Sequence, residues 1–541
     1  MGSSSWRLPT SIVSDKDEAP QRDGSGGSSP NQSGGPIIAI LGVFALFLAS
    51  GAIWFAAGSK TTGDTTAETS GNSVADRSGR ASSDSVDSEA SNASDEEVLK
   101  AAEDFYSSRP YYQQPVGHLE VPDGLPNLEA ETCGGCHAEI YEEWSISTHR
   151  RAWKQDAQFM AELEKSRTGS TAEGSSKDDV GWMCVTCHTP VTNQLERVVV
   201  GLRDGNIGKP IYRKNPSYNP RLQEEAITCA TCHVRNGKIY GPYGDTDAPH
   251  PTAKDPSLRD SSTCTECHQA EAHWPSRSLA CFFSTGQEWS QSQYAKNGET
   301  CQSCHMPTVT RKLAKGFDRP KRKTRRHWFG GSLIPKHPKY TEETARLQTV
   351  YGSGADISLI PAQEAKNVER ASNGSLKTSS CPPDRSCRSY IVRITNEHAG
   401  HYLPTGDPER HLDVAATVRS EDGTVVTEAS QRIASKYKWW PDIREQYDNR
   451  LPPKKHLDFE VHIPKGSDDY SIQITAHKYR MYTEAFEHHD LEGEYVRGRR
   501  FYNARWHIDS AGNLTLQTKE TDKGTVMNDS HSGTPEGPDH R

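Results

Sequence analysis

The sequence predicts an α+β protein with a single transmembrane helix, a mainly helical or irregular cysteine-rich module and a C-terminal β-sandwich-like domain. Three observations predict it: an uncharged apolar run near the N-terminus, five copies of one cysteine motif, and alternating apolar and polar residues near the C-terminus. The expected order is a disordered tail over 1–36, a transmembrane anchor over 37–58, an acidic serine-rich linker over 59–97, the cysteine-rich module over 98–345, a connector over 346–388, the β-sandwich-like domain over 389–520 and a disordered tail over 521–541.

The apolar run from Ile37 to Gly58 contains no charged residue and has the length that a helix needs to cross hydrocarbon. Trp54 near its end suits a membrane interface. The alternative is the apolar region of a cleaved signal peptide, but the run is long for that role and a long polar tail precedes it. We therefore expect an uncleaved, single-pass anchor with the N-terminus in the cytoplasm.

The composition excludes some functions. Hydrophobic residues make up 33% of the 541 residues, and the formal net charge is −9. Both signs of charge are spread along the chain, and one isolated basic run does not indicate a nucleic-acid-binding protein. We expect no nucleic acid among the partners.

The C-terminal third alternates apolar and polar residues with the period of two that is typical of half-buried strands. The pair Asp422-Gly423 favours a tight hairpin turn between two of these strands. We expect about seven strands in a sandwich. The clearest strand candidates are Tyr390–Thr395, Leu412–Val418, Asp458–Pro464 and Tyr470–His477.

The five cysteine motifs all have the pattern Cys-x-x-Cys-His. In this pattern two thiols add to the two vinyl groups of one haem and the adjacent His binds its iron as the proximal ligand. Zinc ribbons, redox pairs and iron–sulfur sites also use paired cysteines, but none requires a His directly after every second Cys. The sequence therefore predicts five covalently bound c-type haems. The expected attachment sites and proximal ligands are Cys133, Cys136 and His137; Cys184, Cys187 and His188; Cys229, Cys232 and His233; Cys264, Cys267 and His268; and Cys301, Cys304 and His305.

Each iron also has a distal position, which a second His closes and which is otherwise available for chemistry. Nine histidines outside the motifs lie between His118 and His411, enough to supply every iron. On a straight helix His149 would lie about 18 Å from His137, so it must serve a different haem. We expect distal ligands at His149, His250, His327 and His401, with His118, His273, His337 and His398 as weaker candidates.

The residues around the motifs resemble a known family. The first motif is followed by Ile140–Trp144 and then by Ser147–Ala152, a pattern similar to the opening of the cytochrome c-554/c-prime family, which is related to hydroxylamine oxidoreductases. The segments 227–241, 288–307 and 327–331 are similar to the same broad family. The resemblance implies distal ligands at His149 and His327, and it implies the haem-module fold more strongly than any substrate.

Two departures from related enzymes narrow the function. The chain has no Cys-x-x-Cys-Lys motif, which ammonia-forming nitrite reductases typically use. It also has five motifs where hydroxylamine oxidoreductases carry eight haems. The sequence therefore favours neither an ammonia-forming nitrite reductase nor a hydroxylamine oxidoreductase.

Three further features lie outside the motifs. Cys381 and Cys387 are six residues apart and we expect a disulfide between them, with free thiols as the alternative. Cys281 has no obvious partner, and we expect a buried thiol there. The basic run from Arg311 to Arg326 is either a solvated loop that neutralises haem propionates or a docking patch for an acidic redox partner.

Taken together, these features predict a membrane-anchored pentahaem cytochrome c that relays electrons between redox proteins in the periplasm or membrane. The alternatives are a reductase or oxidase of a small nitrogen or sulfur compound at one five-coordinate haem, and a haem subunit of a respiratory membrane complex. The haem domains are expected outside the cytoplasm, and an electron-transfer protein is favoured over a stand-alone oxidoreductase.

Overall fold

The structure is a computed structural model. The described residues all lie between 93 and 527. The tail over 1–36, the anchor over 37–58, most of the linker and the end of the C-terminal tail lie outside the described residues. The structure describes residues 93–168, 170–171, 174–175, 178–244, 246–274, 279–371, 376–439, 443–522 and 524–527.

The membrane anchor and the localisation derived from it are corrected. Among the described residues, no helix has the length and apolar character needed to span a membrane. The apolar run over 37–58 is outside this part, so the structure gives the single-pass topology no support and we do not retain it.

The motif-bearing part of the chain mixes short helices with short strands, so the expectation of a mainly helical module is wrong. Apolar residues in this part are scattered in short runs between motifs, which favours many brief elements over a few long helices. The helices are α1 (Asp95–Ser107), α2 (Ala130–Gly134), α3 (Ala138–Ser145), α4 (Ala157–Thr168), α5 (Gly181–His188), α6 (Pro220–Glu224), α7 (Cys229–His233), α8 (Ser262–His268), α9 (Thr285–Ser290), α10 (Gln293–Lys296), α11 (Cys301–His305) and α12 (Thr341–Gln348).

The strands of this part form small sheets between the motifs. Four are antiparallel pairs, and in the fifth β6 joins β5 antiparallel and β7 parallel. The strands are β1 (Ser170–Thr171), β2 (Gly174–Ser175), β3 (Arg197–Leu202), β4 (Pro210–Lys214), β5 (Val234–Arg235), β6 (Lys238–Gly241), β7 (Thr252–Lys254), β8 (Ala270–Trp274), β9 (Leu279–Phe283), β10 (Thr308–Arg311) and β11 (Arg322–Arg325).

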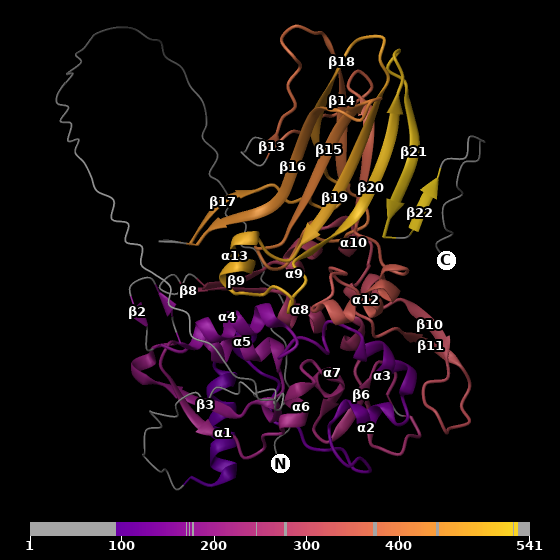
Figure 1. Ribbon diagram of the computed structural model, residues 1–541. Helices are drawn as coiled ribbons and strands as arrows, with labels where there is room; N and C mark the ends of the chain where they lie inside the picture. Colours follow the sequence, from indigo (N-terminus) through magenta and orange to yellow (C-terminus); the bar gives the residue numbers. More distant parts are fainter. Residues whose placement is uncertain are drawn as a thin grey trace, which may run out of the picture. The chain divides into compact units, whose positions relative to one another are not determined.

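The C-terminal part contains two larger sheets (Figure 1). One has the order β12-β14-β18, and the other has the order β13-β16-β15-β19-β20-β21-β22 with β17 paired to β16. The bounds are β12 (Ala355–Pro361), β13 (Leu376–Lys377), β14 (Cys387–Asn396), β15 (His411–Ser420), β16 (Val425–Lys438), β17 (Arg444–Asp448), β18 (His456–Pro464), β19 (Tyr470–Tyr479), β20 (Gly498–Ile508), β21 (Leu514–Thr521) and β22 (Gly524–Met527), with helix α13 (Thr483–His488) between β19 and β20.

One apolar core lies between these two sheets. Alternate residues of each strand point into it, as in β19, where every second residue is buried. Val392 and Phe459 enter from the smaller sheet, and Val414, Ile433 and Ile474 enter from the larger one. All five side chains are fully buried, so the two sheets pack face to face.

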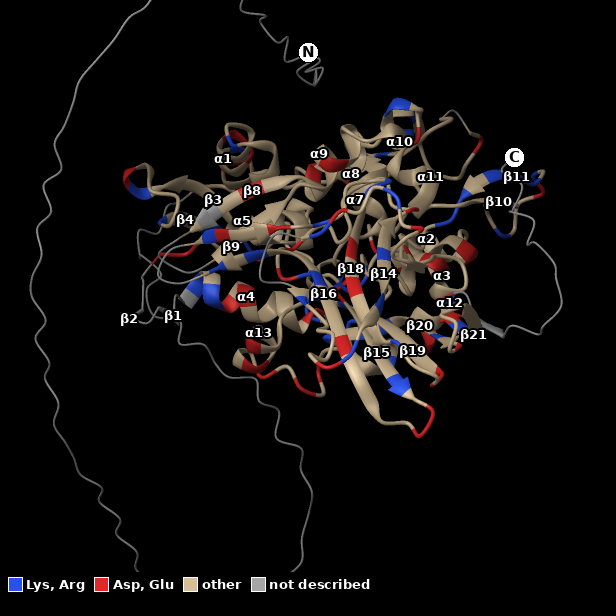
Figure 2. Ribbon diagram, turned by 90° about the horizontal axis from the view of Figure 1, so that it is seen from above, with Lys and Arg blue, Asp and Glu red and all other residues tan. Residues whose placement is uncertain are grey.

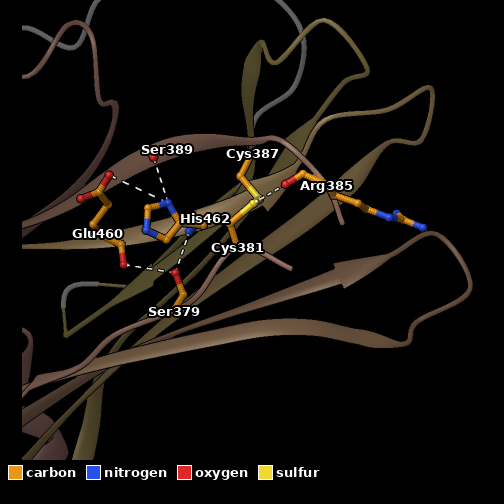
Figure 3. Close-up of a disulfide and its surroundings, with 7 residues drawn as sticks. All are labelled: Ser379, Cys381, Arg385, Cys387, Ser389, Glu460 and His462. Carbon is orange, nitrogen blue, oxygen red and sulfur yellow. Dashed lines mark hydrogen bonds and ion pairs between the residues drawn. A yellow bond between two sulfur atoms is a disulfide. The ribbon is translucent and has the colours of Figure 1, made fainter. Parts of the chain in front are cut away.

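The expected disulfide between Cys381 and Cys387 is confirmed. It closes the loop that leads into β14, and Figure 3 shows it beside Ser379 and His462. The Ser379 hydroxyl accepts a hydrogen bond from the backbone N–H of His462 at 2.7 Å, which ties the same loop to β18. The hairpin turn at Asp422-Gly423 is also confirmed: it joins β15 to β16 with Gly423 at φ 88°.

Candidate functional site

The cysteine motifs sit on short helices that end at the motif His. The second to fifth motifs lie in α5, α7, α8 and α11, and the first begins in α2 and ends just before α3. On a helix, residues three apart lie on one face, so both thiols of each motif can reach one edge of a planar ligand. Side-chain hydroxyls accept hydrogen bonds at the starts of α7 and α11: Thr231 accepts from the backbone N–H of Thr228 at 3.2 Å, and Ser303 accepts from the backbone N–H of Thr300 at 3.1 Å.

The cysteines of different motifs lie next to one another. The thiols of Cys133 and Cys229 lie close enough to shift each other's pKa, which places the first and third motifs side by side. Cys187 and Cys267 join the second and fourth motifs in the same way. Cys264 and Cys301 join the fourth and fifth. The fourth motif therefore contacts both the second and the fifth.

Three motif histidines lie opposite a histidine from a distant part of the sequence. His268 faces His149 with ring centroids 6.3 Å apart, and His233 faces His327 at 6.3 Å. His305 faces His401 at 6.2 Å with the ring planes 15° apart. In none of these pairs are the two rings in direct contact. A gap of similar width separates the two imidazoles in all three pairs.

The width of this gap matches a metal ion between the rings. An imidazole nitrogen lies about 2 Å from a bound transition-metal ion. The atoms of a five-membered ring with bonds of about 1.33 Å lie about 1.1 Å from its centroid. Two imidazoles on opposite sides of one ion would then have centroids about 6.2 Å apart. The three observed separations fit the iron of a haem.

The protonation state of these rings also fits a metal. Burial, together with the neighbouring imidazoles of His268 and His305, lowers the pKa of His149 to about 3. Burial is likewise the main cause that lowers the pKa of His268, His327 and His401 to about 4. At neutral pH these rings are therefore uncharged, which is the form that binds metal.

A fourth pairing involves His137 and His250. The two rings are close enough to interact electrostatically. Burial is the main cause that lowers the pKa of His137, the hydrogen bond with the Leu313 backbone raises it, and the His250 ring lowers it. The Nδ1 atom of His250 has no solvent contact and no hydrogen-bond partner among the described residues. A buried polar atom without a partner is unfavourable unless something else binds it, and a haem iron would satisfy it.

His188 has a different environment. Its ring stacks on Phe159 with centroids 3.5 Å apart, and its Nδ1 atom lies 2.6 Å from the carbonyl oxygen of Ala152. A buried ion pair between Asp156 and Lys336 acts on it electrostatically. Among the side chains that the structure describes, no imidazole faces His188 as in the other pairs, and the side chain of His273 is outside them.

Backbone carbonyl groups orient the rings of three other motif histidines, His137, His233 and His305. The Nδ1 atom of His137 lies 2.9 Å from the oxygen of Leu313, and that of His233 lies 2.8 Å from the oxygen of Tyr240. The Nδ1 atom of His305 is hydrogen-bonded to the oxygen of Gly330. When Nδ1 donates in this way, Nε2 is left as the metal-binding nitrogen.

A buried carboxylate positions His327. Glu143, on α3, accepts a hydrogen bond from the backbone N–H of His327 at 3.0 Å. It also accepts from Arg311 at 2.6 and 3.2 Å and from Arg326 at 2.6 Å. Burial alone would raise the pKa of Glu143, but the hydrogen bonds from Arg311, His327 and Arg326 hold it below its ordinary value. Glu143 therefore stays ionised and fixes the segment that carries His327.

A second buried carboxylate does the same for His401. Glu288, on α9, accepts hydrogen bonds from the backbone N–H of Tyr402 at 3.1 Å and from the Thr405 hydroxyl at 2.6 Å. Its other oxygen accepts from Arg450 at 2.7 Å. His401 lies in the loop between β14 and β15, so Glu288 ties this loop of the C-terminal sheets to the motif-bearing part.

The sequence reasoning missed both carboxylates. Each belongs to a Glu-Trp pair: Glu143-Trp144 begins six residues after His137, and Glu288-Trp289 begins thirteen residues before Cys301. Trp144 donates a hydrogen bond through Nε1 to the oxygen of Ile227 at 2.8 Å, which holds α3 against the chain before the third motif. The repeated pair was the available signal, because a charged residue beside Trp at equivalent places indicates a buried, partnered charge.

The predicted cysteines and histidines have thus been located. Apart from Cys304, which is exposed, the ten motif cysteines are partly buried, and Cys281, also partly buried and free, lies in β9. His149, His327 and His401 lie opposite motif histidines, and His250 lies beside His137. Of the weaker candidates, His337 instead packs against Tyr340 and accepts a hydrogen bond from the backbone N–H of Lys339.

Comparisons with known proteins agree with the motifs. Residues 132–205 match the family described as cytochrome c554 and c-prime. A structure of a penta-heme cytochrome c552 from Thermochromatium tepidum aligns over 72% of this chain and 100% of its own, with 18% sequence identity and a TM-score of 0.46. No curated protein matches. The resemblance inferred from the sequence is confirmed over this segment, and it supports a multihaem c-type cytochrome.

Proposed function

We propose that this chain is a pentahaem cytochrome c that relays electrons between redox proteins. The observation that carries the proposal is the set of three imidazole pairs with centroids 6.2–6.3 Å apart, each pairing one motif histidine with one distant histidine. An iron with two imidazole ligands has no free position, so it exchanges electrons without binding a substrate.

The residues that would hold the five haems follow from the motifs and the pairs. The motif cysteines attach the haems covalently, and each motif histidine is a proximal ligand. The distal ligands are proposed as His250 opposite His137, His327 opposite His233, His149 opposite His268 and His401 opposite His305. When bound, the haems supply reversible one-electron chemistry.

The contacts between motifs support a branched route for electrons. The neighbouring cysteines bring together the first and third, second and fourth, and fourth and fifth motifs. Cys232 of the third motif also acts electrostatically on Cys264 and Cys267 of the fourth. Every motif therefore has at least one neighbouring motif, and the fourth has three. The chain's own part is to fix these positions and to keep the imidazoles buried and neutral.

Stopped-flow reduction of the fully haem-loaded protein by reduced flavin tests the relay. If the haems exchange electrons faster than they receive them, the absorbance change of all haems follows the reductant concentration, with no slow phase that is independent of it. Slow phases independent of reductant concentration and covering most of the haem absorbance would show that electron transfer between the haems is slow, and several separate phases that each scale with reductant concentration would show haems reduced independently; either result would contradict a relay.

A further inference from the structure

The basic run from Arg311 to Arg326 forms a hairpin against the first haem motif. Strands β10 and β11 pair with Arg311 opposite Arg322. At the start of the connecting loop, the carbonyl oxygen of Leu313 lies 2.9 Å from Nδ1 of His137, and the backbone N–H of Lys315 donates to the oxygen of Cys136 at 2.7 Å. This hairpin, residues 308–325, therefore covers the proximal side of the first motif.

The base of the hairpin is fixed rigidly. Arg311 is buried and forms ion pairs with the buried Glu143 on α3 at 2.6 Å. It also donates to the Thr324 hydroxyl at 3.0 Å and to the carbonyl oxygen of Arg325 at 3.0 Å. Arginine in a buried, bidentate pair of this kind holds its partners in one geometry. The outer residues of the hairpin are therefore presented in a defined position beside the first motif.

The charge of the hairpin is concentrated and points outward. Residues 311–326 hold nine Lys and Arg against one Asp, in a chain whose net charge is −9. Figure 2 shows basic residues along this hairpin. Lys315, Lys321 and Lys323 are exposed, and within the part of the chain that the structure describes none of them forms an ion pair. These three exposed lysines are therefore accessible to an anionic partner.

We propose that this hairpin is the docking surface for an acidic, one-electron redox protein that exchanges electrons at the first haem position. Rigidly placed exposed cations steer an anionic partner and set its orientation. The contacts with Cys136 and His137 put the docked partner next to the first motif, so the first haem is the entry or exit of the relay. This inference rests on the relay function proposed above and names where its partner binds.

The test uses the haem-loaded protein and reduced flavodoxin as an acidic one-electron probe. The variant K315E/K321E/K323E reverses three charges on the hairpin, and K377E/K438E/K465E reverses three exposed lysines of the C-terminal sheets as a matched control. At low ionic strength we expect the bimolecular rate constant to fall about tenfold or more in the hairpin variant, and the loss to shrink as salt is added. The control variant should change by less than about threefold, because its charges lie elsewhere.

Three outcomes would overturn the docking surface. The first is an equal rate loss in both variants, which would reflect net charge alone. The second is an unchanged rate in the hairpin variant. The third is a loss of binding to vesicles of anionic phospholipid with the flavodoxin rate unchanged, which would make the hairpin a lipid contact. As a control, both variants must take up as many electrons from dithionite as the unaltered protein. A failure of the relay itself would be seen in the unaltered protein, as slow phases that do not depend on flavin concentration.

Discussion

Replacing Glu143 by Gln is expected to lower the free energy of unfolding by about 3–5 kcal/mol, because it removes the buried counter-charge of Arg311 and leaves only the exposed Glu139 beside it. Arg311 and Glu143 are both almost fully buried, with side-chain exposures of 4% and 5%. Glutamine keeps the size of the side chain but accepts weaker hydrogen bonds and carries no charge. Denaturant unfolding followed by haem absorbance measures the change.

The neighbouring residue provides a matched control. Glu142 also pairs with an arginine, Arg346, at 3.2 Å, but both side chains are more than 60% exposed. An exposed ion pair of this kind contributes about 0–1 kcal/mol to stability, so Glu142→Gln should lower the free energy of unfolding by less than about 1 kcal/mol. Equal effects of the two substitutions would contradict the role assigned to the buried pair.

The same substitution should also perturb the haem whose ligand segment Glu143 holds. Glu143 binds the backbone of His327, so Glu143→Gln is expected to perturb the haem of the third motif. Glu288 holds the loop that carries His401, so Glu288→Gln is expected to perturb the haem of the fifth motif. Each variant is the control for the other in a redox titration that resolves the individual haems.

Replacing His327 by Ala is expected to convert one low-spin haem per molecule to high spin and to leave the remaining haems unchanged. The ring of His327 lies opposite His233, so its removal opens one side of a single iron in the proposed arrangement. Loss of the imidazole should also raise the reduction potential of that haem, since the ligand favours the oxidised iron. Electron paramagnetic resonance (EPR) and a redox titration measure these two effects.

His337→Ala is the matched control for this variant. His337 packs against Tyr340 and lies 3.7 Å from Glu494, away from the motif histidines with which His327 and His401 are paired. The His337→Ala variant should therefore leave the spin states of all haems unchanged. A high-spin signal in the His337 variant, or none in the His327 variant, would contradict the ligand assignment.

Much of the local structure could be predicted from the sequence, because it depends on nearby residues. The period of two located β14, β15, β18 and β19, and the Cys-x-x-Cys-His spacing located the motifs. Strand β12 lies inside the segment expected to be a connector, and it pairs along its whole length with β14. Its partner is distant in sequence, so its own composition gave too little signal.

The arrangement of the site could be predicted only in part. Counting histidines indicated that distal ligands were available, but the partner of each one depends on how distant segments pack. His401 faces His305 because Glu288 fixes a loop between two strands of the C-terminal sheets, and no local pattern encodes that contact. The membrane anchor was inferred from apolar length alone, and the structure gives it no support.

The most direct test of the central claim is an EPR spectrum of the oxidised, fully haem-loaded protein, with high-spin and low-spin iron quantified per molecule. The four imidazole pairs predict at least four low-spin haems out of five. A single high-spin haem would be assigned to His188, which has no facing imidazole among the described side chains, and would be checked with nitrite, hydroxylamine or sulfite. Two or more high-spin haems, or fewer than five haems in total, would contradict the proposed arrangement.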